Sequence, residues 1–242
     1  MARHQLWLDN VANEDVGVVV GEFTLSAPVP RVNTIKVPGR NGDLHIYDGS
    51  YDNRSGSCSA YVYADGGVKA EFAKIQQWLL GSQGYRRLVT DDDQEHFLKA
   101  RLVNGADVAA RLDKIAPFAL KFDCMPFRYL TAGETPIEFS NALGILNPTF
   151  YDSQPLYEIT GDGTVMLGVN NDTLTFKDLG VYIYPRTMYF DAETGNAYTA
   201  DEPNANSRVT TSGNLHFNSG HNAISVSGNV EKIRIIPRWR EL

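Results

Sequence analysis

Apolar and polar residues alternate over most of the first 130 positions of the chain. Short runs that alternate, or that are rich in β-branched residues, fall at 16–20, 22–25, 32–37, 44–47, 58–63, 86–89, 97–103 and 116–122. An alternation of period two is typical of a strand that buries one of its faces. We therefore expect the first half of the chain to be a β-domain.

One segment of this half has helical spacing instead. Val68, Phe72, Ile75 and Leu79 follow one another at intervals of three or four residues, and Trp78 widens the same face. This spacing places the apolar side chains on one side of a helix, and glycines such as Gly81 commonly end helices. The pattern predicts a single helix over about 68–80 that covers one side of the sheet.

A polar interruption at 37–44 separates two of the expected strands. Proline fixes φ and removes a donor, and an Asn-Gly pair is the strongest short signal for a hairpin. The tip also carries a guanidinium and a carboxylate, so we interpret it as a loop presented for a contact; the family resemblance given below makes it a candidate subunit-interface loop. Its residues are Pro38, Gly39, Arg40, Asn41, Gly42 and Asp43. A plain hairpin turn is the alternative.

The pattern of apolar and polar residues changes after a Thr-Ala-Gly-Glu-Thr-Pro stretch at 131–136. No helical period recurs, and short strands are separated by clusters of Asn, Asp, Gly and Pro. The expected strands lie at 157–160, 164–168, 173–176, 181–184, 187–190, 215–217, 223–227 and 232–236, with a hairpin turn at 191–196 and a polar loop at 202–212. Strands at this spacing indicate an antiparallel sandwich. We therefore predict two domains, 1–132 and 133–242.

Composition narrows the possible functions. The chain has 242 residues, 43% of them hydrophobic, and a net charge of −7. Residues 1–132 carry 15 Lys or Arg and 16 Asp or Glu, and residues 133–242 carry 7 and 13. A nucleic-acid binder needs concentrated positive charge, which neither half has. No apolar run is long enough to cross a bilayer, so we expect no association with a membrane. No secretory signal is visible, so we expect the protein to be synthesised in a cytoplasm.

Motifs that carry chemistry are missing from the sequence. The two cysteines, Cys58 and Cys124, lie in strand-like segments and are expected as buried thiols. The acidic run at 91–95 lacks the spacing of a calcium loop, so we interpret it as a solvated hairpin turn. Gly161-Asp162-Gly163 has no helix after it and is expected to be a turn. We predict no catalytic residue, no cofactor and no metal.

A set of short motifs in a fixed order resembles the distal tail protein (Dit) family of siphophages, the bacteriophages with long non-contractile tails. The motifs are the 37–44 stretch, Trp78-Leu79, Asp91-Asp92-Asp93, residues 118–126, Asn147-Pro148, residues 155–163, Tyr189-Phe190-Asp191, residues 219–224 and residues 234–240. The resemblance extends over essentially the whole chain.

The resemblance implies a fold, a function and a set of partners. Members have an N-terminal tail-tube-like β-domain with one helix and a C-terminal galectin-like antiparallel β-sandwich. They form a hexameric ring, single or stacked in pairs, which is the baseplate hub at the tail tip of the virion. The ring joins the tail-tube protein to the tail-associated tip protein, and often to receptor-binding proteins. DNA passes through the ring without sequence-specific binding. Such proteins are structural, not enzymes, and are assembled in the cytoplasm of the bacterial host.

Two other functions remain open at this point. The galectin-like domain could make the chain a carbohydrate-binding protein that recognises the host surface. Sugar-binding galectins use a His-x-Asn-x-Arg strand and a Trp, whereas here His216-Phe217-Asn218 is followed by Ser219-Gly220, and Trp239 is expected to pack. A cell-wall hydrolase is the third alternative. Acidic pairs such as Asp191 and Glu193 could serve glycoside hydrolysis in principle, but on a hairpin turn we expect them to be solvated.

Overall fold

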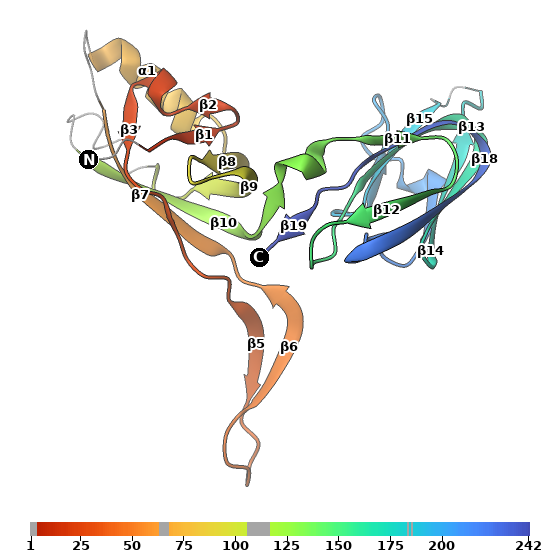
Figure 1. Cartoon of the computed structure of the whole chain (residues 1–242), viewed down its shortest axis with the longest axis horizontal. Helices are drawn as coiled ribbons and strands as arrows, with labels where there is room; N and C mark the ends of the chain where they lie inside the picture. Colours follow the sequence, from red (N-terminus) through yellow and green to blue (C-terminus); the bar gives the residue numbers. More distant parts are fainter. Residues whose placement is uncertain (1–3, 63–67, 106–116, 183, 185) are drawn as a thin grey trace. The chain divides into compact units, whose positions relative to one another are not determined.

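The computed structural model describes residues 4–62, 68–105, 117–182, 184 and 186–242 (Figure 1). The chain divides into two compact units, Met1–Arg128 together with Leu242, and Tyr129–Glu241. The Thr-rich stretch expected between the domains begins with a short 3-10 helix, η2 (Thr131–Glu134), which belongs to the second unit. Each unit has its own cluster of buried apolar side chains, so each has a hydrophobic core of its own.

The first unit is built on one sheet with the strand order β2-β1-β8-β9-β10-β7-β3, and β4 also pairs with β7. The strands are β1 (Leu6–Leu8), β2 (Val11–Ala12), β3 (Val18–Val20), β4 (Thr24–Leu25), β7 (Arg54–Val62), β8 (Arg86–Thr90), β9 (Asp93–Leu102) and β10 (Phe118–Leu130). A short 3-10 helix, η1 (Glu14–Val16), lies between β2 and β3. The pairings for which a register is known are antiparallel.

Alternation along β10 shows why this sheet forms. Phe118, Leu120 and Phe122 are buried, whereas Ala119 and Lys121 between them are exposed. This period of two places Phe118, Leu120 and Phe122 on the face that the helix covers. The sequence pattern predicted this strand over 116–122; it continues to Leu130, and position 116 lies outside the described residues.

The helix α1 (Val68–Leu80) spans the predicted range. Ile75, Trp78 and Leu79 are buried in the core of the first unit, and the indole Nε1 of Trp78 donates a hydrogen bond of 3.2 Å to the carbonyl of Val11. The side chains of Val68 and Phe72, also expected on this face, lie outside the described residues. Within the described ranges, no helix has the length and apolar character needed to cross a bilayer.

A two-stranded sheet, the β-arm, is made by β5 (Pro30–Ile35) and β6 (Leu44–Tyr51), which pair only with each other. Figure 1 shows it running out beyond the strands of the first unit. The strands expected at 44–47 and 58–63 were too short, because β6 continues to Tyr51 and β7 begins at Arg54. Alternation of apolar and polar residues does not mark the full length of these strands, because neither face of the arm is buried.

The second unit contains β11 (Ile137–Phe139), β12 (Leu143–Asn147), β13 (Leu156–Val169), β14 (Asp172–Leu179), β15 (Thr187–Asp191), β16 (Asn196–Tyr198), η3 (Asn206–Arg208), β17 (Val209–Ser212), β18 (Gly220–Ile236) and β19 (Arg240–Glu241). The first part of β13 pairs with β15, its last part pairs with β14, and β18 pairs with β13 along both parts. The two long strands therefore bend from one layer of an antiparallel sandwich into the other.

Glycines at the bend explain how β13 and β18 stay paired. The register shifts between Thr160 and Gly161, and a Cβ built on Gly161 would lie 2.5 Å from the carbonyl oxygen of Asn229. Gly228, on the facing strand, has φ +102°, which L side chains rarely adopt. Our prediction of a turn at Gly161-Asp162-Gly163 is therefore wrong: the segment is a β-bulge inside one long strand.

Three further expectations for this unit need correction. Residues 181–184 were predicted as a strand; the described residues there make a turn, in which the amide of Tyr184 bonds the carbonyl of Val181, and position 183 lies outside the described residues. The loop predicted at 202–212 ends in strand β17. Residues 215–217 contribute only one bridge, between Ser153 and Phe217. The overall expectation, a mainly β protein with one helix and a C-terminal antiparallel sandwich, is confirmed.

Candidate functional site

The predicted interface loop lies at the tip of the β-arm. The two strands are in antiparallel register, with Val32 opposite Tyr47 and Ile35 opposite Leu44. The connection covers residues 36–43, so it is wider than a two-residue hairpin turn. Gly39 and Gly42 each have φ +80°, which explains why glycine occupies both positions.

All six predicted loop residues, Pro38 through Asp43, are exposed. Among the described residues, Arg40 and Asp43 have no ion-pair partner within their own unit or elsewhere. The loop therefore presents one positive and one negative group to its surroundings. Two uncompensated opposite charges at a loop tip are suited to charge pairing with another surface.

Apolar side chains continue this exposed surface down the arm, and the sequence interpretation missed them. The exposed fractions reach 46% for Ile46 and 66% for Tyr47. The full set of exposed apolar residues on the arm and its loop is Val32, Ile35, Val37, Ile46 and Tyr47. The sequence did contain a signal for this surface, because apolar residues fall on both faces of the strands β5 and β6.

The base of the arm is fixed to the first unit by side chains. Arg31 Nε lies 2.8 Å from Asp52 Oδ1, and the ring of Tyr51 packs edge-on against Phe127 at 5.9 Å between centroids. The guanidinium of Arg54 donates through Nε to the carbonyl of Ser26 at 2.7 Å. These contacts hold the arm where it leaves the sheet while its length stays exposed.

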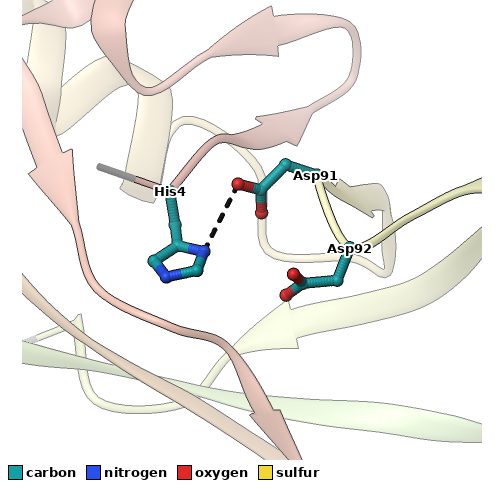
Figure 2. Close-up of side chains that lie close together, drawn as sticks. All are labelled: His4, Asp91 and Asp92. Atoms are coloured by element: carbon teal, nitrogen blue, oxygen red, sulfur yellow. Dashed lines mark ion pairs between the residues drawn. The ribbon is translucent and has the colours of Figure 1, made fainter. Parts of the chain in front are cut away.

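The carboxylates of the acidic run at the β8–β9 turn have different partners. Asp93 pairs with His96 at 2.8 Å and with Arg128 at 3.2 Å. Asp91 lies 3.3 Å from the Nδ1 atom of His4, a residue from the start of the chain (Figure 2). The sequence predicted the turn over 91–95, whereas β9 already begins at Asp93, so the turn is shorter. The approach of His4 was not predicted, because it depends on the pairing of β1 with β8.

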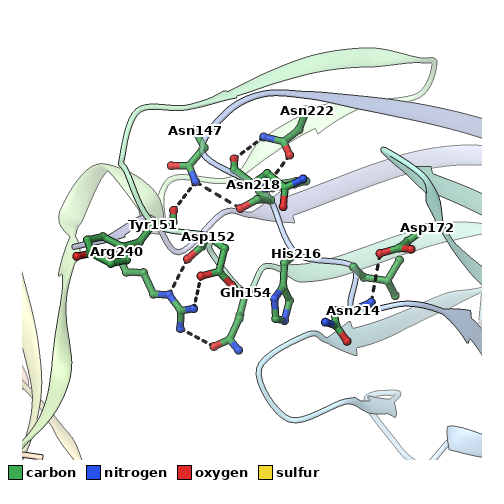
Figure 3. A network of polar contacts seen from close by, with 12 residues as sticks. Asn147, Tyr151, Asp152, Gln154, Asp172, Asn214, His216, Asn218, Asn222 and Arg240 are labelled. Atoms are coloured by element: carbon green, nitrogen blue, oxygen red, sulfur yellow. Dashed lines mark hydrogen bonds and ion pairs between the residues drawn. The ribbon is translucent and has the colours of Figure 1, made fainter. Parts of the chain in front are cut away.

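In the second unit, the residues compared above with the sugar site of galectins make contacts inside the unit. Trp239 is only 6% exposed and packs against Phe217 with 5.7 Å between ring centroids, as predicted. His216 Nδ1 lies 3.0 Å from Asp152 Oδ2, and Figure 3 shows Arg240 reaching Asp152 and Gln154 from the other side. A buried indole cannot stack on a sugar, so these residues do not make the binding surface of a sugar-binding galectin.

The two thiols are buried, as predicted, and unreactive. Burial raises the pKa of Cys58 to about 12, and burial together with the nearby Asp123 raises the pKa of Cys124 to about 12. A thiol with such a pKa is almost fully protonated near neutral pH, and only the thiolate is a good nucleophile. Neither cysteine is therefore suited to covalent catalysis.

Comparisons with known proteins give one informative result. A scan against protein-family models finds no match, and a search of curated proteins finds none either. Among solved structures, the crystal structure of the SPP1 Dit (gp 19.1) protein matches with a TM-score of 0.64 and 11% sequence identity. The alignment covers 97% of this chain and 98% of that chain.

The chain has the Dit fold. The match runs through both units, so it concerns the whole architecture and not one common sandwich. The SPP1 Dit protein is described as a paradigm of the hub adsorption apparatus in phages that infect Gram-positive bacteria. The resemblance to distal tail proteins that the sequence motifs indicated is thereby confirmed at the level of fold.

Proposed function

We propose that this chain is a structural hub of a bacteriophage tail tip or baseplate. The observation that carries the proposal is the Dit fold over 97% of the chain, with both units matched in one alignment. Fold alone does not fix function, but a whole-chain match of two differently built units restricts the candidates far more than a single sandwich would. The buried, high-pKa thiols are consistent with a structural protein without enzymatic activity.

We propose further that the first unit assembles into a hexameric ring, single or stacked, at the tail tip. The ring would join the tail-tube protein to the tail-associated tip protein and to receptor-binding proteins, and would be assembled in the host cytoplasm. Phage DNA would pass through the ring. The net charge of −7 supports passage without retention, because DNA is held by proteins that concentrate positive charge.

The β-arm is the element that we propose as a contact between subunits. A two-stranded sheet is marginally stable alone, and the arm exposes apolar side chains on both of its faces. Rings use head-to-tail contacts, in which an element of one copy meets a different surface of the next. The loop from Pro38 to Asp43 would add the two opposite charges of Arg40 and Asp43 at the end of this contact.

Negative-stain images and light scattering of the purified chain test the proposal. We expect rings with a central hole and a mass of about 161 kDa, since six copies of 26.8 kDa make up one ring. Two stacked rings would have twice that mass. A protein that stays at 26.8 kDa at every concentration, without rings, would contradict the proposal, and specific glycan binding by that monomer would favour the carbohydrate-binding alternative.

A further inference from the structure

His4, Asp91 and Asp92 come together where the first strand passes the β8–β9 turn. The register of β1 and β8 places Leu6 opposite Thr90 and Trp7 opposite Val89. Continuing that register by two residues sets His4 across from Asp92, and the amide of Asp91 bonds the carbonyl of Gln5 at 3.1 Å. The backbone itself therefore holds the histidine against the acidic turn.

The three side chains converge with distances suited to a metal ion. Figure 2 shows the imidazole of His4 and the two carboxylates turned toward one another. One ligand atom from each residue lies within 4.8 Å of the others, and His4 Nδ1 is 3.3 Å from Asp91 Oδ2. Two ligands of a tetrahedral ion bound at about 2.1 Å are separated by about 3.4 Å. Asp92, an exposed residue at the turn, supplies the third ligand atom of the set.

The polar atoms of this cluster have few partners: His4 Nδ1 has Asp91 at ion-pair distance, and Asp92 has none among the described residues. His4 Nδ1 is shielded from solvent and makes no hydrogen bond with the described residues, although Asp91 lies within ion-pair distance. Asp92 makes no ion pair or hydrogen bond with any described residue, whereas the next carboxylate, Asp93, meets both His96 and Arg128. A shielded imidazole nitrogen beside two carboxylates is an arrangement that a bound cation would satisfy.

We propose that His4, Asp91 and Asp92 bind a divalent first-row metal ion of the Zn²⁺ class. One imidazole and two carboxylates suit Zn²⁺ better than Ca²⁺ or Mg²⁺, which prefer oxygen ligands alone. Water would fill the remaining position. The ion would fasten the start of the chain to the β8–β9 turn, independently of whether the chain forms a hub.

Zn²⁺ titration of the full chain without a histidine tag tests the site. After EDTA treatment and dialysis, we expect isothermal titration to show one saturable Zn²⁺ per chain and Tm to rise with Zn²⁺ concentration. Co²⁺ in place of Zn²⁺ should give visible d–d absorption. His4→Gln and Asp92→Asn should each weaken binding at least about 10-fold, since even outer-sphere changes cost that much in metal sites.

His221→Gln is the matched control, because His221 is an exposed histidine that belongs to the second unit. It should bind Zn²⁺ as the unaltered chain does. Asp92→Asn alters an exposed side chain and keeps the fold, so its binding is interpretable even if His4→Gln proves unstable. An unaltered chain that takes up no Zn²⁺, or variants that bind it as tightly as the control, would reduce the cluster to a simple ion pair and overturn the proposal.

Discussion

Asp152 lies between two basic side chains in the second unit. Its Oδ2 atom is 3.0 Å from His216 Nδ1, and its Oδ1 atom accepts a hydrogen bond of 2.8 Å from Arg240. The hydrogen bond from His216, helped by Arg240, lowers the pKa of Asp152 to about 2, and partial burial acts in the opposite direction. The carboxylate therefore prefers its ionised form more strongly in the folded chain than in the unfolded one.

Replacing Asp152 by Asn should destabilise the second unit by about 1 kcal/mol near neutral pH, a value reduced for solvent screening of this partly exposed group. A folded-state pKa below the unfolded value gives stability that is present above pH of about 4 and is lost as the pH falls toward about 2. Urea unfolding at pH 7 and at pH 3 measures this: the difference between the two proteins should shrink at the lower pH.

Asp201→Asn is the control for that substitution, because Asp201 is an exposed carboxylate of the same unit. It should change the free energy of unfolding by less than about 0.5 kcal/mol. A loss in Asp152→Asn that stays the same between pH 7 and pH 3 would mean that the ionised carboxylate is not what stabilises this site.

At the scale of the element, the bend shared by β13 and β18 decides the architecture of the second unit. Both strands cross from one layer to the other, and they do so where Gly161 and Gly228 let the two backbones approach closely. A Cβ on Gly228 would lie 2.4 Å from the carbonyl oxygen of Thr164. The bend therefore depends on missing side chains, and not on a particular contact.

Gly228→Ala should destabilise the second unit by about 3 kcal/mol, because it combines a positive φ with a clash against backbone. Gly144→Ala is the matched control: Gly144 also lies in a strand, β12, and an added Cβ there meets nothing within 4 Å. Thermal unfolding of both variants measures the difference. Equal Tm values for the two would show that the bend tolerates a side chain and would refute this account.

The same elements show what a sequence can predict. The helix and the strand alternation of β10 were predicted, because one buried face leaves a period in the sequence. The continuity of β13 through Gly161-Asp162-Gly163 was not, since a bulge and a turn use the same residues. The pairing of His4 with the acidic turn depends on register between distant segments, which no local pattern contains.

At the scale of the whole molecule, the fold and the sequence carry different kinds of information. The chain and SPP1 Dit share 11% identity yet align over nearly their full lengths, so the shared feature is the arrangement of the elements. Short motifs in a fixed order indicated that arrangement, while the residues along the arm that would make the contact had no motif. The exposed apolar side chains of the arm lie within the segments expected as strands, 32–37 and 44–47, but the alternation did not show that both faces of the arm stay exposed.

Two variants of the β-arm test whether it joins subunits, and by which force. Ile46→Ser removes an exposed apolar side chain, and Arg40→Ala combined with Asp43→Ala removes both tip charges. Each should shift the ring toward smaller species in light scattering while changing Tm little, because exposed side chains contribute little to folding. The control Leu146→Ser alters a 57% exposed aliphatic residue of the second unit and should leave the mass unchanged.

Salt separates the two contributions. Charge pairing weakens at high ionic strength, whereas burial of apolar area does not, so the unaltered ring should lose mass in salt if the tip charges contribute to it. The double charge variant should then be insensitive to salt, and Ile46→Ser should remain sensitive. Rings of unchanged mass in both variants, at low and high salt, would remove the arm from the contact and leave the ring to be held by other surfaces of the first unit.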